Sequence, residues 1–283
     1  MSFIFFAWAQ PNYLWIIIVS ITLNYFGALA IAKYKDVKVV LLFTVVVANI
    51  GLLFYFKYFE FTIHLINKIT RFSISIPDII LPIGISFFTF QGISYVIDVY
   101  RDDVPVQKSI LNVALYISMF PQLIAGPIVR YSDINKEITR RNITVEDICD
   151  GIEYFIIGLG KKVIIANTLA SLVDPIWESG AHRHTAILAW TASIAYTLQI
   201  YFDFSGYSEM AIGLGNMLGF TFPQNFNLPY ISQNITEFWR RWHISLSTWF
   251  RDYIYIPLGG NRKRVYLNFI YSIPINRNMA WSL

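Results

Sequence analysis

The sequence has few charged residues and almost no cysteine, and both shortages restrict what the protein can be. Of its 283 residues, 14% are charged and 55% are hydrophobic, whereas soluble domains usually carry about a quarter charged residues. The single cysteine, Cys149, excludes an intrachain disulfide and a metal site built from several cysteines. We expect Cys149 to be a packing residue, because free cysteine is usually buried. The composition predicts an integral membrane protein.

Histidine is also scarce, with 4 residues in the whole chain. His182 and His184 flank Arg183 in a short polar stretch, where solvated side chains are more common than a metal site. No other histidine pair has the spacing of metal ligands. We therefore predict no metal site and no tightly bound cofactor.

Long stretches without Asp, Glu, Lys or Arg recur along the chain, and each approaches the roughly 20 apolar residues that a helix needs to cross a bilayer. These stretches are 1–32, 39–56, 79–97, 109–129 and 184–202. Helices satisfy their own backbone hydrogen bonds in lipid. The pattern therefore predicts an all-α polytopic bundle, a single membrane-embedded domain over 1–283, with 11–32 as a retained span rather than a cleaved signal peptide.

The positions of the basic residues indicate the orientation of the chain. The loop KYKDVK (33–38) holds three lysines against one aspartate, which predicts a cytoplasmic loop and an N-terminus outside. The net charge is +4, but the cations lie beside apolar runs, where they meet anionic lipid. We expect membrane lipids and not nucleic acid as partners of a multi-pass membrane protein.

Helix breakers interrupt two of the uncharged runs. They are Pro82 and Gly84 in 79–97, and Pro121, Gly126 and Pro127 in 109–129. If both runs crossed the bilayer, the basic segment 130–147 would lie outside, against the positive-inside rule. We expect one run to be re-entrant, and such backbone is tolerated only where protein or a watery cavity covers it.

Two adjacent lysines, Lys161 and Lys162, interrupt the apolar run 156–173. They can mark the membrane interface, with a short amphipathic helix before them and a span after them. Alternatively, a buried lysine can line a substrate path. We favour the interface. The next segment, 203–230, is rich in glycine and predicts a short helix followed by an ordered loop.

The stretch EFWRRWHISLSTWFRDYIYIPLGGNRK (237–263) combines tryptophan, arginine and a histidine. Its large apolar residues follow helical spacing and predict one continuous helix with a single apolar face. This face contains Trp239, Trp242, His243, Leu246, Trp249, Phe250 and Tyr253. We expect Thr236 to cap the start and Pro257, Gly259 and Gly260 to end the helix. Arginine on the other side predicts that the helix lies in the membrane interface.

His243 is the unusual residue of this face, because a buried imidazole needs a hydrogen-bonding partner. It is either a packed histidine with a satisfied partner or a catalytic or substrate-positioning residue. The ordinary pKa of histidine suits acid–base chemistry near neutrality. The residues alone leave both interpretations open.

Four segments together resemble the membrane-bound O-acyltransferase family. They are FPQLIAGPIVRYSDI (120–134), YFDFSGYSEMAIGLGNMLGF (201–220), FPQNFNLPYISQNITEFWRRWHISLS (222–247) and the rest of the 237–263 stretch. The resemblance extends over about 77–268 in the same order. Within the family, the chain is most similar to the branch that acetylates alginate, with relatives that act on peptidoglycan and teichoic acid.

The resemblance implies helices around a tunnel and a membrane O-acyltransferase activity. An acetyl group from a cytoplasmic thioester donor, such as acetyl-CoA, would pass towards an extracytoplasmic polysaccharide, either an alginate-like exopolysaccharide or a cell-wall polymer. Extracytoplasmic acetyltransferase proteins would be partners. The resemblance implies a catalytic role for His243, and a role in positioning substrate or donor for Arg240, Arg241, Trp242, Ser245, Arg251 and Asp252.

The family's second histidine follows a tryptophan in a later apolar segment, and the chain contains no histidine after His243. The later spans are missing as well, so we expect a C-terminally truncated chain. Two other functions stay open. One is a membrane transporter or channel for an acyl carrier or polymer, and the other is an inactive remnant.

Overall fold

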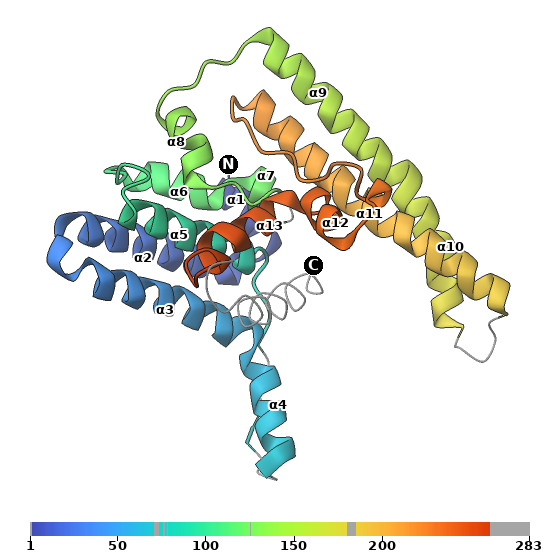
Figure 1. Ribbon diagram of the computed structural model, residues 1–283, viewed down its shortest axis with the longest axis horizontal. Coiled ribbons are helices and arrows are strands. Elements are labelled where there is room, and N and C mark those ends of the chain that lie inside the picture. Colours follow the sequence, from blue (N-terminus) through green and yellow to red (C-terminus); the bar gives the residue numbers. More distant parts are fainter. Residues whose placement is uncertain are drawn as a thin grey trace. The chain divides into compact units, whose positions relative to one another are not determined.

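The structure is a computed structural model that describes residues 2–70, 74–75, 77, 79–124, 126–179 and 185–260. This part of the chain is helical and contains no strand (Figure 1), which confirms the predicted all-α membrane bundle. The helices form two compact units, Met1–Ile124 with Ile128–Arg140, and Ala125–Pro127 with Arg141–Leu283. Each unit is described separately below.

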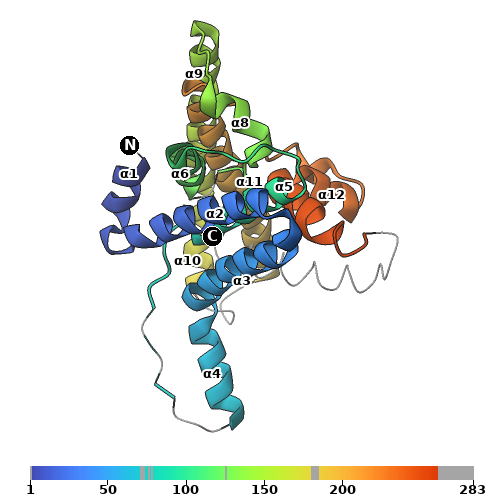
Figure 2. The same ribbon diagram turned by 90° about the vertical axis from the view of Figure 1, so that its left-hand side faces the viewer.

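The first unit is built from eight helices within the described residues. They are α1 (Ser2–Ala9), α2 (Leu14–Lys33), α3 (Lys38–Lys57), α4 (Phe59–Thr70), α5 (Ile85–Tyr100), α6 (Ile110–Ser118), α7 (Phe120–Leu123) and α8 (Tyr131–Thr139). Short 3₁₀ turns at Pro11–Tyr13 and Lys35–Val37 precede α2 and α3. Figure 2 shows α2 and α3 as neighbouring helices, and α5 packs against both of them.

A pair of buried asparagines joins α2 to α3. Nδ2 of Asn24 donates to Oδ1 of Asn49 at 3.1 Å, and Nδ2 of Asn49 donates back to Oδ1 of Asn24 at 3.0 Å. Gly92 of α5 lies against this pair, because a Cβ there would come within 2.3 Å of Nδ2 of Asn24. Reciprocal amide bonds of this kind hold membrane helices together where lipid offers no hydrophobic driving force.

The two runs with helix breakers are interrupted where their prolines and glycines predict. Helix α5 begins only after Gly84, which has a φ of 73°. A Cβ at this glycine would lie 2.2 Å from the carbonyl oxygen of Leu123, so no other residue fits there without a shift of the backbone. In the second run, α6 ends after 9 residues and the 4-residue α7 follows. The cavity that we expect beside these segments stays a prediction.

The second unit contains two long helical segments and a shorter C-terminal part. Its helices are α9 (Val145–Gly160), α10 (Asn167–Glu178), α11 (Ala186–Met217), α12 (Ile235–Arg241) and α13 (Ile244–Phe250). A π-helical segment, Lys161–Ala166, joins α9 to α10 without a break, and a second one, Arg251–Tyr255, follows α13. A 3₁₀ turn at Pro229–Ile231 lies in the loop between α11 and α12.

Glycines allow α9 and α11 to pack closely along each other, as Figure 1 shows. A Cβ at Gly158 would lie 2.5 Å from the carbonyl oxygen of Gly206, and a Cβ at Gly206 would lie 2.6 Å from that of Gly158. Gly151 and Gly213 make the same reciprocal contact seven residues away along each helix. Since the numbers rise on one helix and fall on the other, the helices are antiparallel. Small residues at such positions are typical of packed membrane helices.

The two lysines of the π-helical segment form ion pairs with α11. Nζ of Lys161 donates to Oε1 of Glu209, and Nζ of Lys162 donates to Oδ1 of Asp203. The helix is not interrupted at the lysines, and the favoured interpretation that they mark the membrane interface stays a prediction. The helix runs on through Val145–Glu178 for 34 residues, and two carboxylates of α11 compensate the lysine charges along it.

Three helices of the described chain are long and apolar enough to cross a membrane: Pro11–Lys33, Lys35–Lys57 and Val145–Glu178. The first two agree with the spans expected at 11–32 and 39–56. Of the run 184–202, residues 186–202 are helical and belong to α11, but α11 is not among the three. It continues to Met217, so the helix expected at the start of 203–230 is the end of this long helix, and a loop follows as expected. Asp203 and Glu209 of α11 pair with the lysines of the π-helical segment.

Two smaller expectations concern cysteine and histidine. Cys149 lies on an exposed side of α9, so its prediction as a packing residue is wrong. Its neighbour Gly151 takes the close contact with α11 instead. His182 and His184 lie outside the described residues.

Candidate functional site

The segment that carries His243 is two helices with a sharp break between them. Helix α12 ends at Arg241, Trp242 is extended, and His243 has a φ of 44° and a ψ of 57° before α13 begins at Ile244. This left-handed conformation costs a residue with a side chain about 1–2 kcal/mol. The prediction of one continuous helix through 237–253 is therefore wrong, although the residues on both sides of the break are helical.

The caps explain where the two helices begin. Oδ1 of Asn234 accepts a hydrogen bond from the backbone N–H of Glu237 at 2.8 Å, so Asn234 caps α12 and not Thr236 as predicted. The backbone carbonyl of His243 accepts the first hydrogen bond of α13 from Ser247 at 3.1 Å. His243 is thus the residue at which the second helix starts.

Asn225, in the loop before α12, holds the break in place. Its backbone carbonyl accepts from the N–H of Ile244 at 2.9 Å, and its Oδ1 accepts from the backbone N–H of Ser245 at 3.2 Å. Oδ1 also accepts from Oγ of Ser245 at 2.9 Å and lies 3.0 Å from Nδ1 of His243. These bonds offset the cost of the left-handed backbone at His243, because they replace the helical bonds that a continuous helix would make.

The hydrogen bonds around Asn225 determine the tautomer of His243. A backbone N–H can only donate, so the side-chain atom that accepts from Ser245 is the amide oxygen of Asn225. Nδ1 of His243 must therefore donate to this oxygen, and in the neutral ring Nε2 is left with its lone pair. Among the described residues, Nε2 has no hydrogen-bond partner.

The imidazole is enclosed by aromatic rings. His243 is 5% exposed, the ring of Phe204 on α11 meets it edge to face at 4.8 Å between centroids, and Phe226 lies at 6.4 Å. Burial among apolar rings lowers the pKa of His243 to about 3, because the charged form loses its water. The histidine is neutral near neutrality, with Nε2 as an acceptor.

Trp242 belongs to the same aromatic cluster. Its ring stacks on Phe238 at 5.6 Å and meets Phe226 edge to face at 5.1 Å between centroids. Tyr201 and Phe204 of α11 complete the cluster on the other side. Trp242 therefore fixes the His243 turn against α11 through packing.

The two arginines of α12 differ in their surroundings. Arg241 forms an ion pair with Glu237 at 2.9 Å, and its Nη1 donates to the backbone carbonyl of Asn227 at 3.2 Å. The backbone N–H of Gln233 also donates to Oε2 of Glu237 at 3.0 Å. This bond and the one from Arg241 hold the pKa of Glu237 below its ordinary value. Arg240 is exposed and has no ion-pair partner among the described residues, so it is the cation available to a ligand.

The remaining predicted residues divide into two groups. Ser245 is brought to His243 through their shared acceptor on Asn225. Arg251 and Asp252 lie beyond the end of α13 and pair with each other, with Nε of Arg251 at 2.7 Å from Oδ1 of Asp252. The structure thus assembles His243, Ser245 and Trp242 in one place, and Arg251 and Asp252 in another.

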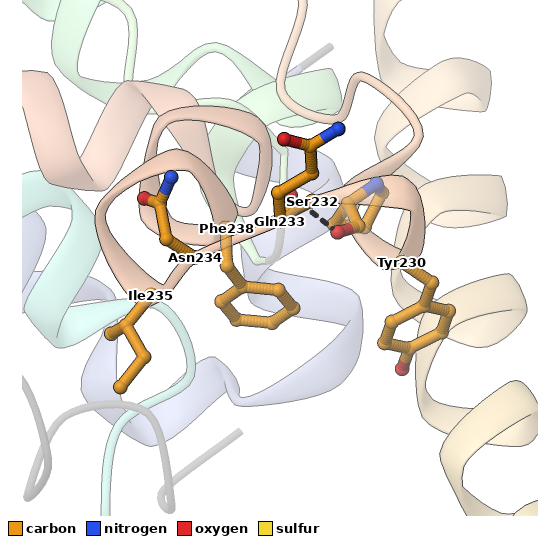
Figure 3. A pocket seen from close by; sticks show the side chains of 7 residues that line it. Tyr230, Ser232, Gln233, Asn234, Ile235 and Phe238 are labelled. Carbon is orange, nitrogen blue, oxygen red and sulfur yellow. Dashed lines mark hydrogen bonds between the residues drawn. The ribbon is translucent and has the colours of Figure 1, made fainter.

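A surface cleft of about 340 Å³ lies beside α12 (Figure 3). The rings of Tyr230 and Phe238 border it, and the side chains of Gln233 and Asn234 lie along it. His243 is not among its lining residues. The cleft therefore adjoins the aromatic cluster without including the imidazole.

Sequence reasoning missed Asn225. The segment FPQNFNLPY (222–230) shows only a turn-forming loop, and Asn225 and Asn227 look equivalent in it. In the structure Asn225 is 1% exposed and Asn227 is exposed. The one available signal was the need of a buried histidine for a partner, which does not say where in the chain that partner lies.

Stability should fall on mild acidification because of His243. The unfolded chain binds a proton at an ordinary pKa near 6.5, whereas the folded protein binds it only near pH 3. Between these values the unfolded state holds more protons, so stability rises with pH, by up to about 1.4 kcal/mol per pH unit from this one group. Thermal unfolding in detergent, measured between pH 6 and pH 5, checks the slope.

The variant His243→Gln isolates this contribution. It removes the titrating group, so its unfolding temperature should change less between pH 6 and pH 5 than that of the parent. An equal pH dependence of the two proteins would contradict the assignment of the slope to His243.

The fold and the site together define a class of protein. It is an all-helical membrane protein with a buried, neutral histidine held at a break between two helices. Residues 101–273 match the model of MBOAT, the membrane-bound O-acyltransferase family. The chain therefore belongs to the membrane-bound O-acyltransferase family, as the motifs predict.

Three curated proteins are similar in sequence to this chain. It is 47% identical over 269 residues to the probable alginate O-acetylase AlgI of Pseudomonas aeruginosa, covering 92% of this chain and 51% of that protein. It is 39% identical to the peptidoglycan O-acetyltransferase of Helicobacter pylori, over 95% of this chain and 57% of that protein. It is 37% identical to the teichoic acid D-alanyltransferase of Bacillus subtilis, over 62% and 45%. The chain thus spans about half the length of these relatives.

Proposed function

We propose that the chain is part of a membrane O-acyltransferase that passes an acetyl group from an acyl thioester towards a polysaccharide outside the cell membrane. The observation that carries the proposal is the buried His243, held by Asn225 so that a neutral Nε2 is left without a partner among the described residues. Acyl transfer needs such an acceptor for the proton of an attacking hydroxyl.

The relatives support the choice of acceptor. Alginate and peptidoglycan appear in the names of two of them, and teichoic acid in the third. All three are polymers outside the cytoplasm, so a cell-surface polymer with hydroxyl groups is the acceptor class that we propose. An acyl thioester such as acetyl-CoA on the cytoplasmic side is the proposed donor, and extracytoplasmic acetyltransferases are the proposed partners. The proposed location is the cell inner membrane, with several spans.

The site residues have different proposed roles. Nε2 of His243 contacts the hydroxyl that attacks the acyl group, and Ser245 and Trp242 keep the imidazole in position. Arg240 is exposed at the end of α12 and offers charge-assisted hydrogen bonds to the phosphates of a donor. Arg241 acts indirectly, since Glu237 already compensates its charge. Arg251 and Asp252 are proposed to support the donor side from the end of α13.

The low pKa of His243 limits how it can act. An imidazole with a pKa of about 3 is a weak base in the resting site, so it first orients the hydroxyl as a hydrogen-bond acceptor. The negative charge that develops on the acyl group during attack then raises its proton affinity. The hydroxyl proton is transferred only as the new bond forms.

Transfer from a labelled acetyl thioester, in membranes that contain the protein and a polysaccharide acceptor, tests the proposal. His243→Gln should lower the rate at least about 100-fold, within the range that general acid–base groups contribute. The matched control is His64→Gln, because His64 is an exposed histidine on α4. Equal, measurable transfer by parent and His243→Gln would assign His243 to packing, and no transfer by the parent would favour a transporter or an inactive remnant.

A further inference from the structure

Helix α4 (Phe59–Thr70) carries two exposed stripes of opposite chemistry. Residues four apart lie on the same face of a helix. The charged stripe consists of Glu60, His64 and Lys68. The apolar stripe consists of Phe61, Leu65 and Ile69, whose exposed fractions are 67%, 45% and 71%. Three large apolar side chains are thus exposed side by side in the part of the chain that the structure describes.

A third face of α4 meets the rest of the first unit. Ile63 is buried on this face. Asn67, four residues later, binds the chain that follows the helix: its Nδ2 donates to the carbonyl of Ile74 at 2.9 Å, and its Oδ1 accepts from the N–H of Ile74 at 3.0 Å. Leu65 is two residues from both Ile63 and Asn67, which places it on the opposite side of a helix with about 3.6 residues per turn. These contacts therefore leave the apolar stripe uncovered.

The apolar stripe continues the exposed apolar surface of α3, which is one of the three helices long and apolar enough to cross a membrane. Large apolar side chains are exposed along one side of α3, namely Val40, Phe43, Val47, Ile50 and Phe54. Tyr58, with a φ of −120° and a ψ of −11°, then ends the helix. Both views show α4 turning away from the axis of α3 (Figures 1 and 2). A helix that runs across the axis of a span lies along the membrane surface.

The junction between α3 and α4 has the composition of a membrane interface. Lys57 is the last residue of α3, and its Nζ lies 5.9 Å from the centre of the Tyr58 ring. The rings of Tyr55 and Phe59 lie 5.4 Å apart between centroids. Aromatic and basic residues gather where a span meets the headgroups. Helix α4 has 12 residues, so at about 18 Å it is too short to cross the roughly 30 Å hydrocarbon layer itself.

We propose that α4 lies in the lipid–water interface, at the end of α3 opposite the KYKDVK loop, with its apolar stripe in the edge of the hydrocarbon layer and its charged stripe facing water. An amphipathic helix of this kind buries its apolar face about 5–10 Å into the boundary between headgroups and acyl chains. The charged stripe contains one carboxylate and one lysine, whose charges cancel. Burial of the apolar stripe is therefore what holds α4 at the membrane, and anionic lipid is not required.

Spin labels measure which medium surrounds each stripe. The full chain, with Cys149→Ser to remove its one cysteine, carries a single label at Phe61→Cys or, as the matched position, at His64→Cys. In phosphatidylcholine vesicles, collisions of the label with oxygen report lipid, and collisions with a water-soluble nickel chelate report water. We expect a several-fold higher ratio of oxygen to nickel collisions at Phe61 than at His64, which corresponds to a depth of about 5–10 Å.

A label at Val47→Cys, in the middle of α3, calibrates the depth scale and should lie about 15 Å deep, half of the hydrocarbon layer. A Phe61 label that nickel reaches as readily as the His64 label would place the apolar stripe in water. A Phe61 label that neither reagent reaches would mean that protein, such as a second copy of the chain, covers the stripe. Either result overturns the proposal, and so does ready access of nickel to the Val47 label.

A charge within the apolar stripe tests the cause of the insertion. With the label at Phe61, Ile69→Glu should raise the collisions with nickel several-fold, because a carboxylate resists transfer out of water. Lys68→Glu introduces the same side chain one position away, on the charged stripe, and should leave the collisions unchanged. An equal rise in both variants, or insertion of the parent only after phosphatidylglycerol is added, overturns burial of the apolar stripe as the cause. No measurement here requires acyl transfer, so the proposal is tested separately from the proposed function.

Discussion

Replacing Lys161 by glutamate is expected to prevent stable packing of α9 against α11. Lys161 pairs with Glu209 within an otherwise apolar run, and the side chains are 26% and 24% exposed. Oε2 of Glu209 is buried without a further partner, so Lys161 supplies its main compensation. Lys161→Glu places two carboxylates against each other where water is scarce. We expect a loss of about 3 kcal/mol, the low end for breaking a buried pair, since part of each side chain remains exposed.

The charge-swapped variant decides whether the pair itself is responsible. Lys161→Glu with Glu209→Lys restores opposite charges across the same interface and should recover most of the unfolding temperature measured in detergent. Lys68→Glu, at an exposed position on α4, controls for the change in net charge and should have little effect. If the swapped protein stays as unstable as the single variant, the ion pair is not what stabilises the two helices.

Replacing Gly158 by leucine should have an effect of similar size through sterics. A Cβ at this position would lie 2.5 Å from the carbonyl oxygen of Gly206, which belongs to the backbone of α11 and has no rotamer to move into. The helices must separate, and overpacking of this kind costs about 1–3 kcal/mol or more. We expect loss of a monodisperse peak in size-exclusion chromatography and a lower unfolding temperature.

Gly160→Leu is the matched control on the same helix. A Cβ at Gly160 meets nothing within 4 Å, so leucine there should be tolerated, with a gain of up to about 1 kcal/mol from helix propensity. Equal instability of the two variants would mean that lengthening any side chain in α9 is harmful, and that the close contact with Gly206 is not the cause.

The local pattern of the sequence predicts helices well and their interruptions unevenly. The uncharged runs at 11–32 and 39–56 form helices with nearly the predicted ends. Gly84 also interrupts its run as predicted, because a proline and a glycine change the backbone where they stand. Uncharged runs, prolines and glycines act on the backbone at their own positions, so helices and their breaks of this kind can be predicted from the local sequence.

The break at His243 and the lysine pairs show what the pattern omits. Helical spacing continues through His243, and the interruption comes from Asn225, 18 residues earlier in the chain. The partner of Lys161 lies 48 residues later in the chain, so the residues around the lysine do not reveal the ion pair. Both features depend on hydrogen bonds between distant segments, to which periodicity is insensitive. The motifs therefore predict His243 as a candidate site residue but could not reveal Asn225 or the paired charges.

If the helix that carries Lys161 and Lys162 crosses the bilayer, their ion pairs with α11 would also affect how the protein responds to membrane voltage. The apolar run 154–173 is about 30 Å long as a helix, which matches the hydrocarbon layer of a bilayer. Lys161 and Lys162 lie near its midpoint, so if a bilayer surrounds this run, it contains two positive and two negative charges deep within it. Because these charges cancel, the potential does little net work on the helix pair. Neutralising one lysine leaves a single charge there, and a whole charge moved across the membrane is worth about 2.3 kcal/mol per 100 mV.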